Sequence, residues 1–235
     1  MPKKIIRRKH RLSSFQTITL GFAGVILLGA LLLMLPISTI AGCVTPFNET
    51  LFTATSAVCV TGLVVQDTGS YWSGFGQTII LVLIQIGGLG VITVAASFAL
   101  LSGRKISLMQ RSTMQDAISA PKVGGIVRLT RFILRGTFLI ELLGALAMLP
   151  VFCHDYGWRG IWMAVFHSIS AFCNAGFDIL GTESNLYPSL TGYADSPTIN
   201  ITIMLLIVVG GIGFLTWAVS YTHLRAHETS AHLVC

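Results

Sequence analysis

Four long apolar stretches limit what this chain can fold into. They cover approximately residues 17–40, 76–101, 129–152 and 197–220. Each is long enough to form a helix across the hydrocarbon core of a bilayer, which takes roughly 20 mostly apolar residues. Only 10% of the residues are charged, whereas a soluble domain carries about 25%. The sequence therefore predicts an all-α membrane protein that crosses the cell membrane several times.

The charged residues are divided between alternate connections of these predicted helices. Basic residues fill the N-terminal segment 1–16 and the middle connection 102–128, whereas the other two connections are acidic. Because basic connections stay in the cytoplasm, we predict a cytoplasmic N-terminus and acidic outer connections. Acidic groups there would raise the local concentration of cations, or would only keep the outer face soluble. The net charge of +6 therefore reflects topology and does not indicate binding to nucleic acid.

The N-terminus also fits a second interpretation, a lipoprotein signal. A basic start and an apolar run precede Cys43, which follows Ile40, Ala41 and Gly42. The apolar core of a signal is usually only about 7–15 residues long, and this one is longer. The internal repeat described next also argues against a removable signal, because it includes a proline in this region.

The five cysteines do not form a recognisable ligand or disulfide pattern. They are Cys43, Cys59, Cys153, Cys173 and Cys235, and no two of them are separated by the two residues of a Cys-x-x-Cys motif. A free cysteine is often a small buried hydrophobe. We predict neither a disulfide nor a resident metal site.

The chain contains an internal repeat. Met34-Leu35-Pro36 recurs 114 positions later as Met148-Leu149-Pro150. At the same offset, Ser56, Ala57, Cys59 and Gly62 recur as Ser170, Ala171, Cys173 and Gly176. The sequences "IGGLGVIT" and "VGGIGFLT" follow within the second and fourth apolar stretches. We therefore predict two repeats, 17–101 and 129–220, each with an outer helix, a re-entrant pore loop and an inner helix, as in potassium channels.

Each predicted pore loop begins with a half-helix, at residues 47–59 and 160–173. In the first, Asn48 is the expected N-cap, and Glu49 lies near the positive end of the helix dipole. A short uncharged segment with a central glycine follows each half-helix. Irregular backbone at membrane depth is tolerated only where it is buried in protein or lines water. Glycine permits the dihedrals that turn successive carbonyls to one axis, where they replace the hydration shell of potassium. A pore lining is the leading interpretation.

The two predicted pore loops and the helices that follow them resemble those of a known family, the Trk/Ktr/HKT superfamily of potassium uptake proteins. "TSAVCVTGLVV" (55–65) and "IQIGGLGVIT" (84–93) are similar to its first filter and following helix, and "SISAFCNAGFDIL" (168–180) and "VVGGIGFLTW" (208–217) to the second. The similarity covers residues 12–219. It implies a transporter of K⁺, or alternatively Na⁺. Because the sequence contains nothing that resembles a catalytic triad, a metal site or a phosphate-binding loop, we predict neither an enzymatic activity nor a covalently bound cofactor. By position, the similarity implies these filter residues: Val60, Thr61, Gly62, Leu63, Asn174, Ala175, Gly176, Phe177.

The resemblance also implies an assembly larger than this chain. Its members carry four repeats around one pore, form homodimers and bind cytoplasmic regulatory subunits with nucleotide-binding domains. The basic segment 103–135 is where such a subunit would touch, unless these charges only fix topology and meet anionic lipid. Because two repeats cannot close a fourfold ring, either two copies of the chain assemble into one pore or the chain is a half that does not conduct on its own, and we expect the second. The rival interpretation is a membrane fragment without any transport role.

Near Ser220 the character of the sequence changes. Residues 221–235 show no periodic pattern of apolar residues and contain three of the six histidines. We expect a non-native tail, with the authentic coding sequence ending near Val219. Metal binding by His223, His227 and His232 is the alternative, and no pattern of carboxylates supports it.

Several single residues leave two interpretations open. Asp67 and Asp178 follow the two predicted filters, and would attract entering cations at the outer mouth or cap local turns. Glu141 lies inside the third apolar stretch, where a carboxyl group is a functional candidate or a hydrogen-bonding group between helices. His167 is a packing residue or a proton relay. The glycines at 87, 88, 210 and 211 serve close helix packing or a hinge.

Overall fold

The protein is described here by a computed structural model covering residues 13–90, 126–213 and 216. Over these residues it is helical, with two isolated β-bridges and no strand. This confirms the all-α prediction. Most of the predicted basic connection and the predicted tail, residues 221–235, lie outside the described residues.

In its described residues, the first repeat contains three α-helices. Helix α1 (Ser14–Leu33) begins with a capping box, in which the Gln16 N–H donates to Ser13 Oγ (3.2 Å) and the Ser13 N–H to Gln16 Oε1 (3.0 Å). The short helix α2 (Phe47–Val58) follows a 3₁₀ turn, η1 (Pro36–Ser38). Helix α3 (Gly74–Leu89) begins at Ser73, whose hydroxyl accepts from the Gly76 N–H.

The second repeat has the same order. The long helix α6 (Ile126–Tyr156) is followed by the short helix α7 (Arg159–Phe172), a 3₁₀ turn η2 (Thr191–Tyr193) and helix α8 (Pro197–Ile212). The two short helices are therefore present where half-helices were predicted. In each repeat the short helix packs against both of the longer ones.

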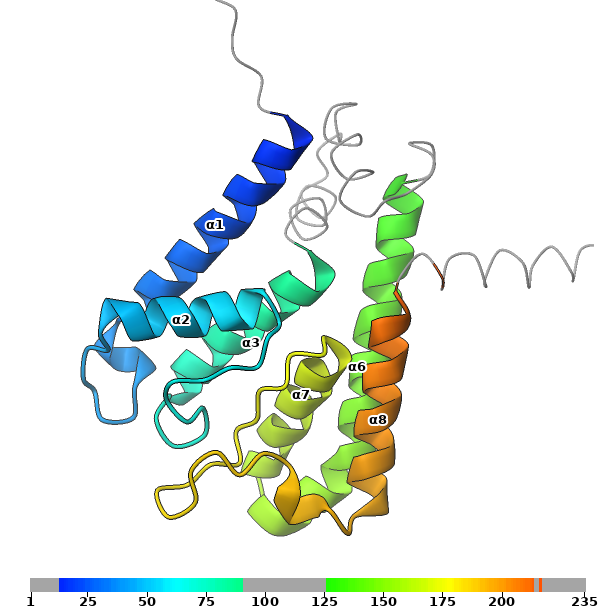
Figure 1. The fold of residues 1–235 in the computed structure, drawn as a ribbon. Helices are drawn as coiled ribbons and strands as arrows, with labels where there is room; N and C mark the ends of the chain where they lie inside the picture. Colours follow the sequence, from blue (N-terminus) through cyan, green and yellow to red (C-terminus); the bar gives the residue numbers. More distant parts are fainter. Residues whose placement is uncertain (1–12, 91–125, 214–215, 217–235) are drawn as a thin grey trace, which may run out of the picture.

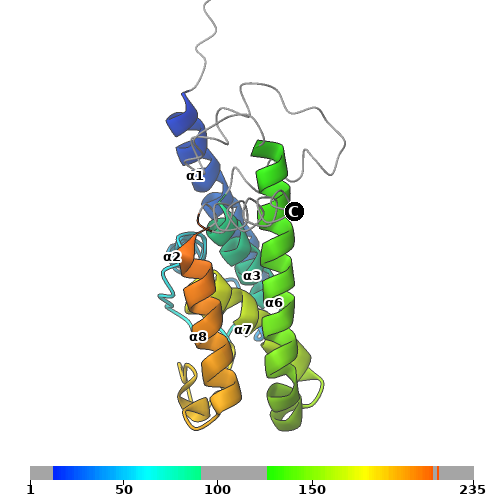
Figure 2. The same ribbon diagram turned by 90° about the vertical axis from the view of Figure 1, so that its right-hand side faces the viewer.

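The two repeats lie side by side, with α1, α2 and α3 in one half and α6, α7 and α8 in the other (Figure 1). In the view turned by 90°, α6 and α8 flank α7 (Figure 2). The repeats meet where α3 packs against α7. One continuous apolar core joins them, built around fully buried side chains such as Trp72, Ile84, Phe152 and Phe166.

In the described part of the chain, two helices are long and apolar enough to cross a membrane, at Gln16–Leu33 and Thr130–Tyr156. Helices α3 and α8 are apolar but have 16 residues each, which corresponds to about 24 Å at 1.5 Å per residue. Both end at glycines with left-handed backbone, Gly90 (φ +81°) and Gly213 (φ +88°). Large apolar side chains such as Leu28 and Leu142 point outward and are more than half exposed. Outward apolar faces of this kind mark contact with lipid or with further protein.

Several predicted helix ends are wrong, and so is the predicted N-cap of α2. The stretches 76–101 and 197–220 were each predicted as one helix, but α3 ends at Leu89 and α8 at Ile212, each before a glycine with positive φ. The first apolar stretch was predicted to be helical to residue 40, but α1 ends at Leu33, ahead of Pro36. Proline restricts the preceding residue to extended backbone, and Leu35 adopts ψ 139°. Asn48 does not cap α2, because the helix begins at Phe47, as predicted, and Pro46 holds the N-cap position without a side-chain bond. Glu49 does lie in the first turn, as predicted.

Candidate functional site

The two short helices end in the same way, 114 positions apart. The Cys59 N–H donates to the Thr55 carbonyl (2.8 Å), and the Cys173 N–H donates to the Ile169 carbonyl (2.9 Å). Directly after them come the two segments predicted to form filters. We call residues 59–65 the first loop and residues 173–179 the second loop.

Each loop places left-handed backbone at alternate residues. In the first loop, φ is +54° at Val60 and +76° at Gly62. In the second, φ is +58° at Asn174 and +71° at Gly176. These are equivalent positions of the repeat. A positive φ at every second residue departs from an ordinary strand and allows successive carbonyls to face a common side, and it is easiest for glycine.

The same main-chain hydrogen bonds hold both loops to their helices. The Thr61 N–H donates to the Ser56 carbonyl (3.0 Å), and the equivalent Ala175 N–H donates to the Ser170 carbonyl (2.8 Å). The Val60 N–H and the Asn174 N–H likewise reach the carbonyls of Ala57 and Ala171. The unusual backbone is therefore fixed by the end of each helix.

The two loops lie against each other at their glycines. A Cβ atom on Gly62 would stand 2.6 Å from the carbonyl oxygen of Ala175 and 3.4 Å from the Cα of Gly176. A Cβ on Gly176 would have the Cα of Gly62 as its nearest neighbour, at 3.7 Å. The structure thus brings the two predicted filter glycines together. Gly62 is required by conformation and by space, and Gly176 by conformation.

Side chains support the two loops differently. In the first loop, the hydroxyls of Ser56 and Thr61 share a hydrogen bond (2.9 Å). The second loop has Ala175 in place of Thr61, and the hydroxyl of Ser170 instead donates to the Phe177 carbonyl (2.6 Å). The Phe177 oxygen therefore already accepts a hydrogen bond within the protein.

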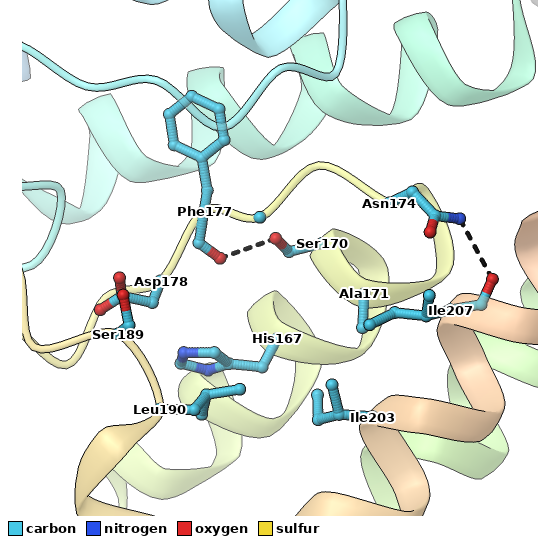
Figure 3. A pocket seen from close by; sticks show the side chains of 11 residues that line it. His167, Ser170, Ala171, Asn174, Phe177, Asp178, Ser189, Leu190, Ile203 and Ile207 are labelled. Atoms are coloured by element: carbon cyan, nitrogen blue, oxygen red, sulfur yellow. Dashed lines mark hydrogen bonds between the residues drawn. The ribbon is translucent and has the colours of Figure 1, made fainter.

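The Asn174 amide ties the second loop to α8. Its Nδ2 donates to the main-chain carbonyl of Ile207 (3.3 Å), and Figure 3 shows this contact together with the one between Ser170 and Phe177. The remaining predicted filter residues differ in exposure. Leu63 is 60% exposed, whereas the side chains of Ala175 and Phe177 are buried.

The Asp67 carboxyl group accepts hydrogen bonds from both repeats. It is 4% exposed, and its Oδ1 accepts from the N–H groups of Gly69 (3.1 Å) and Ser70 (2.8 Å) and from the Ser70 hydroxyl. Its Oδ2 accepts from the N–H of Tyr187 (2.9 Å), in the second repeat. These contacts favour turn capping over attraction of cations at this residue.

The Asp178 carboxyl group is half-buried and accepts from the Leu180 N–H (3.1 Å). Burial raises its pKa, and the nearby charge of Asp67 acts in the same direction. The geometry leaves both interpretations of Asp178 open, because its second oxygen makes no hydrogen bond to a described residue.

A pocket of about 220 Å³ lies beside the second loop, between α7 and α8 (Figure 3). His167 lines it and is 2% exposed. The imidazole Nδ1 lies 2.7 Å from the Met163 carbonyl, and the ring stacks on Phe152. These contacts favour the packing interpretation of His167.

Several contacts between the repeats were not predicted from the sequence. Trp162 Nε1 on α7 donates to Gln77 Oε1 on α3 (2.8 Å), and the Tyr187 hydroxyl donates to the Val65 carbonyl (3.0 Å). The predicted packing role of the α3 glycines is confirmed, since Gly87 meets the Val58 carbonyl and Gly88 meets the Cys173 side chain. No local sequence signal marks Trp162 or Tyr187, because each acts on a residue far away in the chain.

Among the described residues, Cys43, Cys59, Cys153 and Cys173 are free thiols. No group of three or more histidine, cysteine, aspartate or glutamate side chains in the described parts of the chain could hold a metal ion. The groups found at the two loops are main-chain carbonyls, the hydroxyls of Ser56, Thr61 and Ser170 and the Asn174 amide. Such oxygens can replace the water around a monovalent cation.

Comparison with known proteins identifies the family. The profile of TrkH, described as a cation transport protein, matches residues 12–230. The chain is 38% identical over 231 residues to the potassium/sodium uptake protein NtpJ of Enterococcus hirae, covering 98% of this chain and 49% of that one. It is 43% identical over 203 residues to the Ktr system potassium uptake protein B of Bacillus subtilis, covering 85% and 43%. The protein of the same name from Vibrio alginolyticus is 34% identical over 209 residues, covering 88% and 44%.

The chain belongs to the TrkH family of cation transport proteins. This confirms the family resemblance stated from the two loops. The chain spans less than half the length of these relatives.

Proposed function

We propose that this chain is half of the pore of a potassium uptake protein in the cell membrane. The first and second loops would be re-entrant and would contribute half of a filter of main-chain carbonyls. The observation that carries the proposal is the paired backbone: left-handed residues at 60 and 62 and at 174 and 176, directly after two short helices. Potassium uptake by the relatives named above supports the choice of ion.

The filter would use the carbonyls of residues 60–63 and 174–177, with a smaller contribution from Phe177. Its carbonyl oxygen accepts from Ser170, so its share in ion contact is smaller than that of the other positions. The rest of the ring would come from two further repeats. The surface around Gly211 supports this, because the nearest atom to a Cβ there is Asn174 Nδ2 at 3.8 Å, whereas the corresponding Gly88 is covered by Cys173 of the next repeat.

Sodium is the second candidate ion, because one relative is named a potassium/sodium uptake protein. The two ions are distinguished by uptake of K⁺ or Rb⁺ with Na⁺ as competitor, in a strain deficient in potassium transport and expressing the full-length protein. We expect Na⁺ to compete weakly. Equal competition would favour the sodium-permeable alternative.

The same assay tests the filter assignment. Gly62→Ser in the full-length protein should weaken the preference for K⁺, because its Cβ meets the Ala175 carbonyl. Gly74→Ser is the matched control, since a Cβ at Gly74 has no neighbour within 4 Å and its φ is not positive. An unchanged ion ratio in Gly62→Ser, with both variants present in the membrane, would contradict the assignment.

We also propose that the full-length protein is a homodimer that binds a cytoplasmic nucleotide-binding subunit, with its N-terminus in the cytoplasm. Two relatives named as members of a Ktr system support a second component. Co-purification of the full-length protein with the candidate subunit tests the partner. Reporter fusions to the N-terminus test the orientation, and a periplasmic or external signal would contradict it.

A further inference from the structure

The contact between the two repeats buries a group of polar side chains that the proposed pore does not use. Glu141 on α6 is 4% exposed, and its Oε1 accepts from Gln85 Nε2 on α3 (2.9 Å). Thr137 lies one turn earlier on α6 and is fully buried. Residues four apart share one face of a helix, so the Thr137 hydroxyl lies on the Glu141 side of α6.

Three oxygen atoms of this group have no hydrogen-bond partner. They are Glu141 Oε2, Gln85 Oε1 and Thr137 Oγ1, and each is buried. A buried polar atom without a partner is costly, and native structures contain few of them. Three such atoms at one contact between helices therefore point to a binding site for a proton or a cation.

No positively charged side chain among the described residues compensates Glu141, which forms no ion pair with any of them. Helix α7 contributes the Ser168 hydroxyl, but this donates to the main-chain carbonyl of Glu141 (2.6 Å) and not to the carboxyl group. The Cys173 thiol, directly after α7, packs on Gly88 of α3 and lies near enough to interact electrostatically with Glu141. An isolated carboxylate in the interior of a membrane protein is strongly disfavoured.

We propose that Glu141 is a proton-binding site, with the proton on Oε2. The carboxylic acid then has a donor as well as an acceptor, as does the Gln85 amide. Its O–H would donate to Gln85 Oε1 while Gln85 Nε2 donates to Glu141 Oε1. This cyclic pair gives a partner to two of the three unpaired oxygens at once. The site is a neutral link between the inner helix of the first repeat and the first helix of the second.

A sodium ion would be the other occupant of these oxygens, since hard cations prefer oxygen ligands. The existing contact favours the proton. Gln85 presents an N–H group to Glu141 Oε1. This N–H group repels a cation and occupies that oxygen, so that Oε2 is the carboxyl oxygen left to bind a ligand. One such oxygen is sufficient to hold a proton. The test below separates the two.

The link lies close to both loops. Gln85 is two residues before Gly87, which packs on the Val58 carbonyl at the end of α2. Glu141 accepts at its main chain from Ser168 of α7, two residues before the Ser170 that holds the second loop. The bound proton would therefore help to fix the two short helices relative to each other.

The direct test is infrared spectroscopy of the full-length protein in lipid. We expect a carbonyl-stretch band of a protonated carboxylic acid that shifts in D₂O and disappears in Glu141→Gln. Glu183→Gln, at an exposed position, is the matched control and should keep the band. A band that persists in Glu141→Gln, or that is absent from the parent protein at neutral pH, would overturn the proposal.

Thermal unfolding provides the second readout. Glu141→Gln can form the same cyclic pair with Gln85 and should unfold near the parent temperature, whereas Glu141→Leu should unfold at a lower one. Equal destabilisation by both variants would overturn the proposal. Replacing Na⁺ with choline should leave the parent curve unchanged. A stabilisation by Na⁺ that Glu141→Gln abolishes would instead identify a sodium site.

Discussion

The loop after α2 and the loop after α7 share their left-handed positions and their main-chain anchors, but they differ in nearly every side-chain contact that supports them. Val60 corresponds to Asn174 and Thr61 to Ala175, and the hydroxyls of Ser56 and Ser170 bind different partners. The backbone conformation is repeated, whereas the side-chain contacts that support it are not. This is expected where the main chain does the chemistry, because carbonyl positions are then constrained and side chains need only hold them.

The largest expected difference between the loops is at their glycines. Gly176→Ala must place alanine at φ +71°, which costs about 1–2 kcal/mol for left-handed backbone. Gly62→Ala carries the same cost and also brings a Cβ to 2.6 Å from the Ala175 oxygen. We expect Gly62→Ala to lower the unfolding temperature of the full-length protein more than Gly176→Ala does. Gly74→Ala is the control, and equal losses at 62 and 176 would contradict the asymmetry.

The next effect concerns the first left-handed position of each loop. Asparagine tolerates left-handed backbone, whereas a β-branched residue is strained there. Asn174→Val should be destabilising by about 1–2 kcal/mol, because it adds this strain and removes the bond to Ile207. Val60→Asn should be neutral or stabilising. Chemical denaturation of both variants checks the signs, and destabilisation of similar size in both would show that backbone strain is not the cause.

The smallest effect is expected at the two serines. Ser170→Ala removes the donor to the Phe177 carbonyl, and should cost about 1 kcal/mol, the usual net value of a hydrogen bond. Ser56→Ala should cost less, because Thr61 is exposed and water can replace the lost partner. Unfolding of the two variants side by side measures the difference. A larger loss of stability in Ser56→Ala than in Ser170→Ala would contradict this ranking of the two hydroxyl contacts.

The repeat made much of the fold predictable. A fixed offset of 114 located both short helices, and the glycines at 62 and 176 indicated left-handed backbone that the structure contains. The left-handed conformation of Val60 carried no such signal, because a β-branched residue disfavours it. It is imposed by the bonds of residues 60 and 61 to the end of α2.

Equal sequences did not always give equal structures. Met34-Leu35-Pro36 and Met148-Leu149-Pro150 are identical, yet α1 ends before Pro36 while α6 continues past Pro150 to Tyr156. The first proline leads into a 3₁₀ turn whose Ser38 donates to Leu32 (2.8 Å) and accepts from Ser73 (2.9 Å). Such long-range contacts decide whether a helix ends at a proline, and one sequence does not reveal them.

The contacts between the repeats were the least predictable part. Asp67, Gln77 and Gln85 each bind a residue of the second repeat. Their partners are distant in sequence and lack any motif, so the sequence left Asp67 with two interpretations and gave no reason to single out Gln77 or Gln85. The pairing depends on how the two repeats pack.

A density map of the full-length protein in Rb⁺, determined within a lipid bilayer, tests the central idea most directly. If main-chain oxygens replace ion-bound water, rubidium peaks should lie on the axis around which all the loops of the full-length protein are arranged, within contact distance of carbonyls from residues 60–63 and 174–176. A well-ordered map in which these oxygens turn into the protein, with no ion density beside them, would contradict the account.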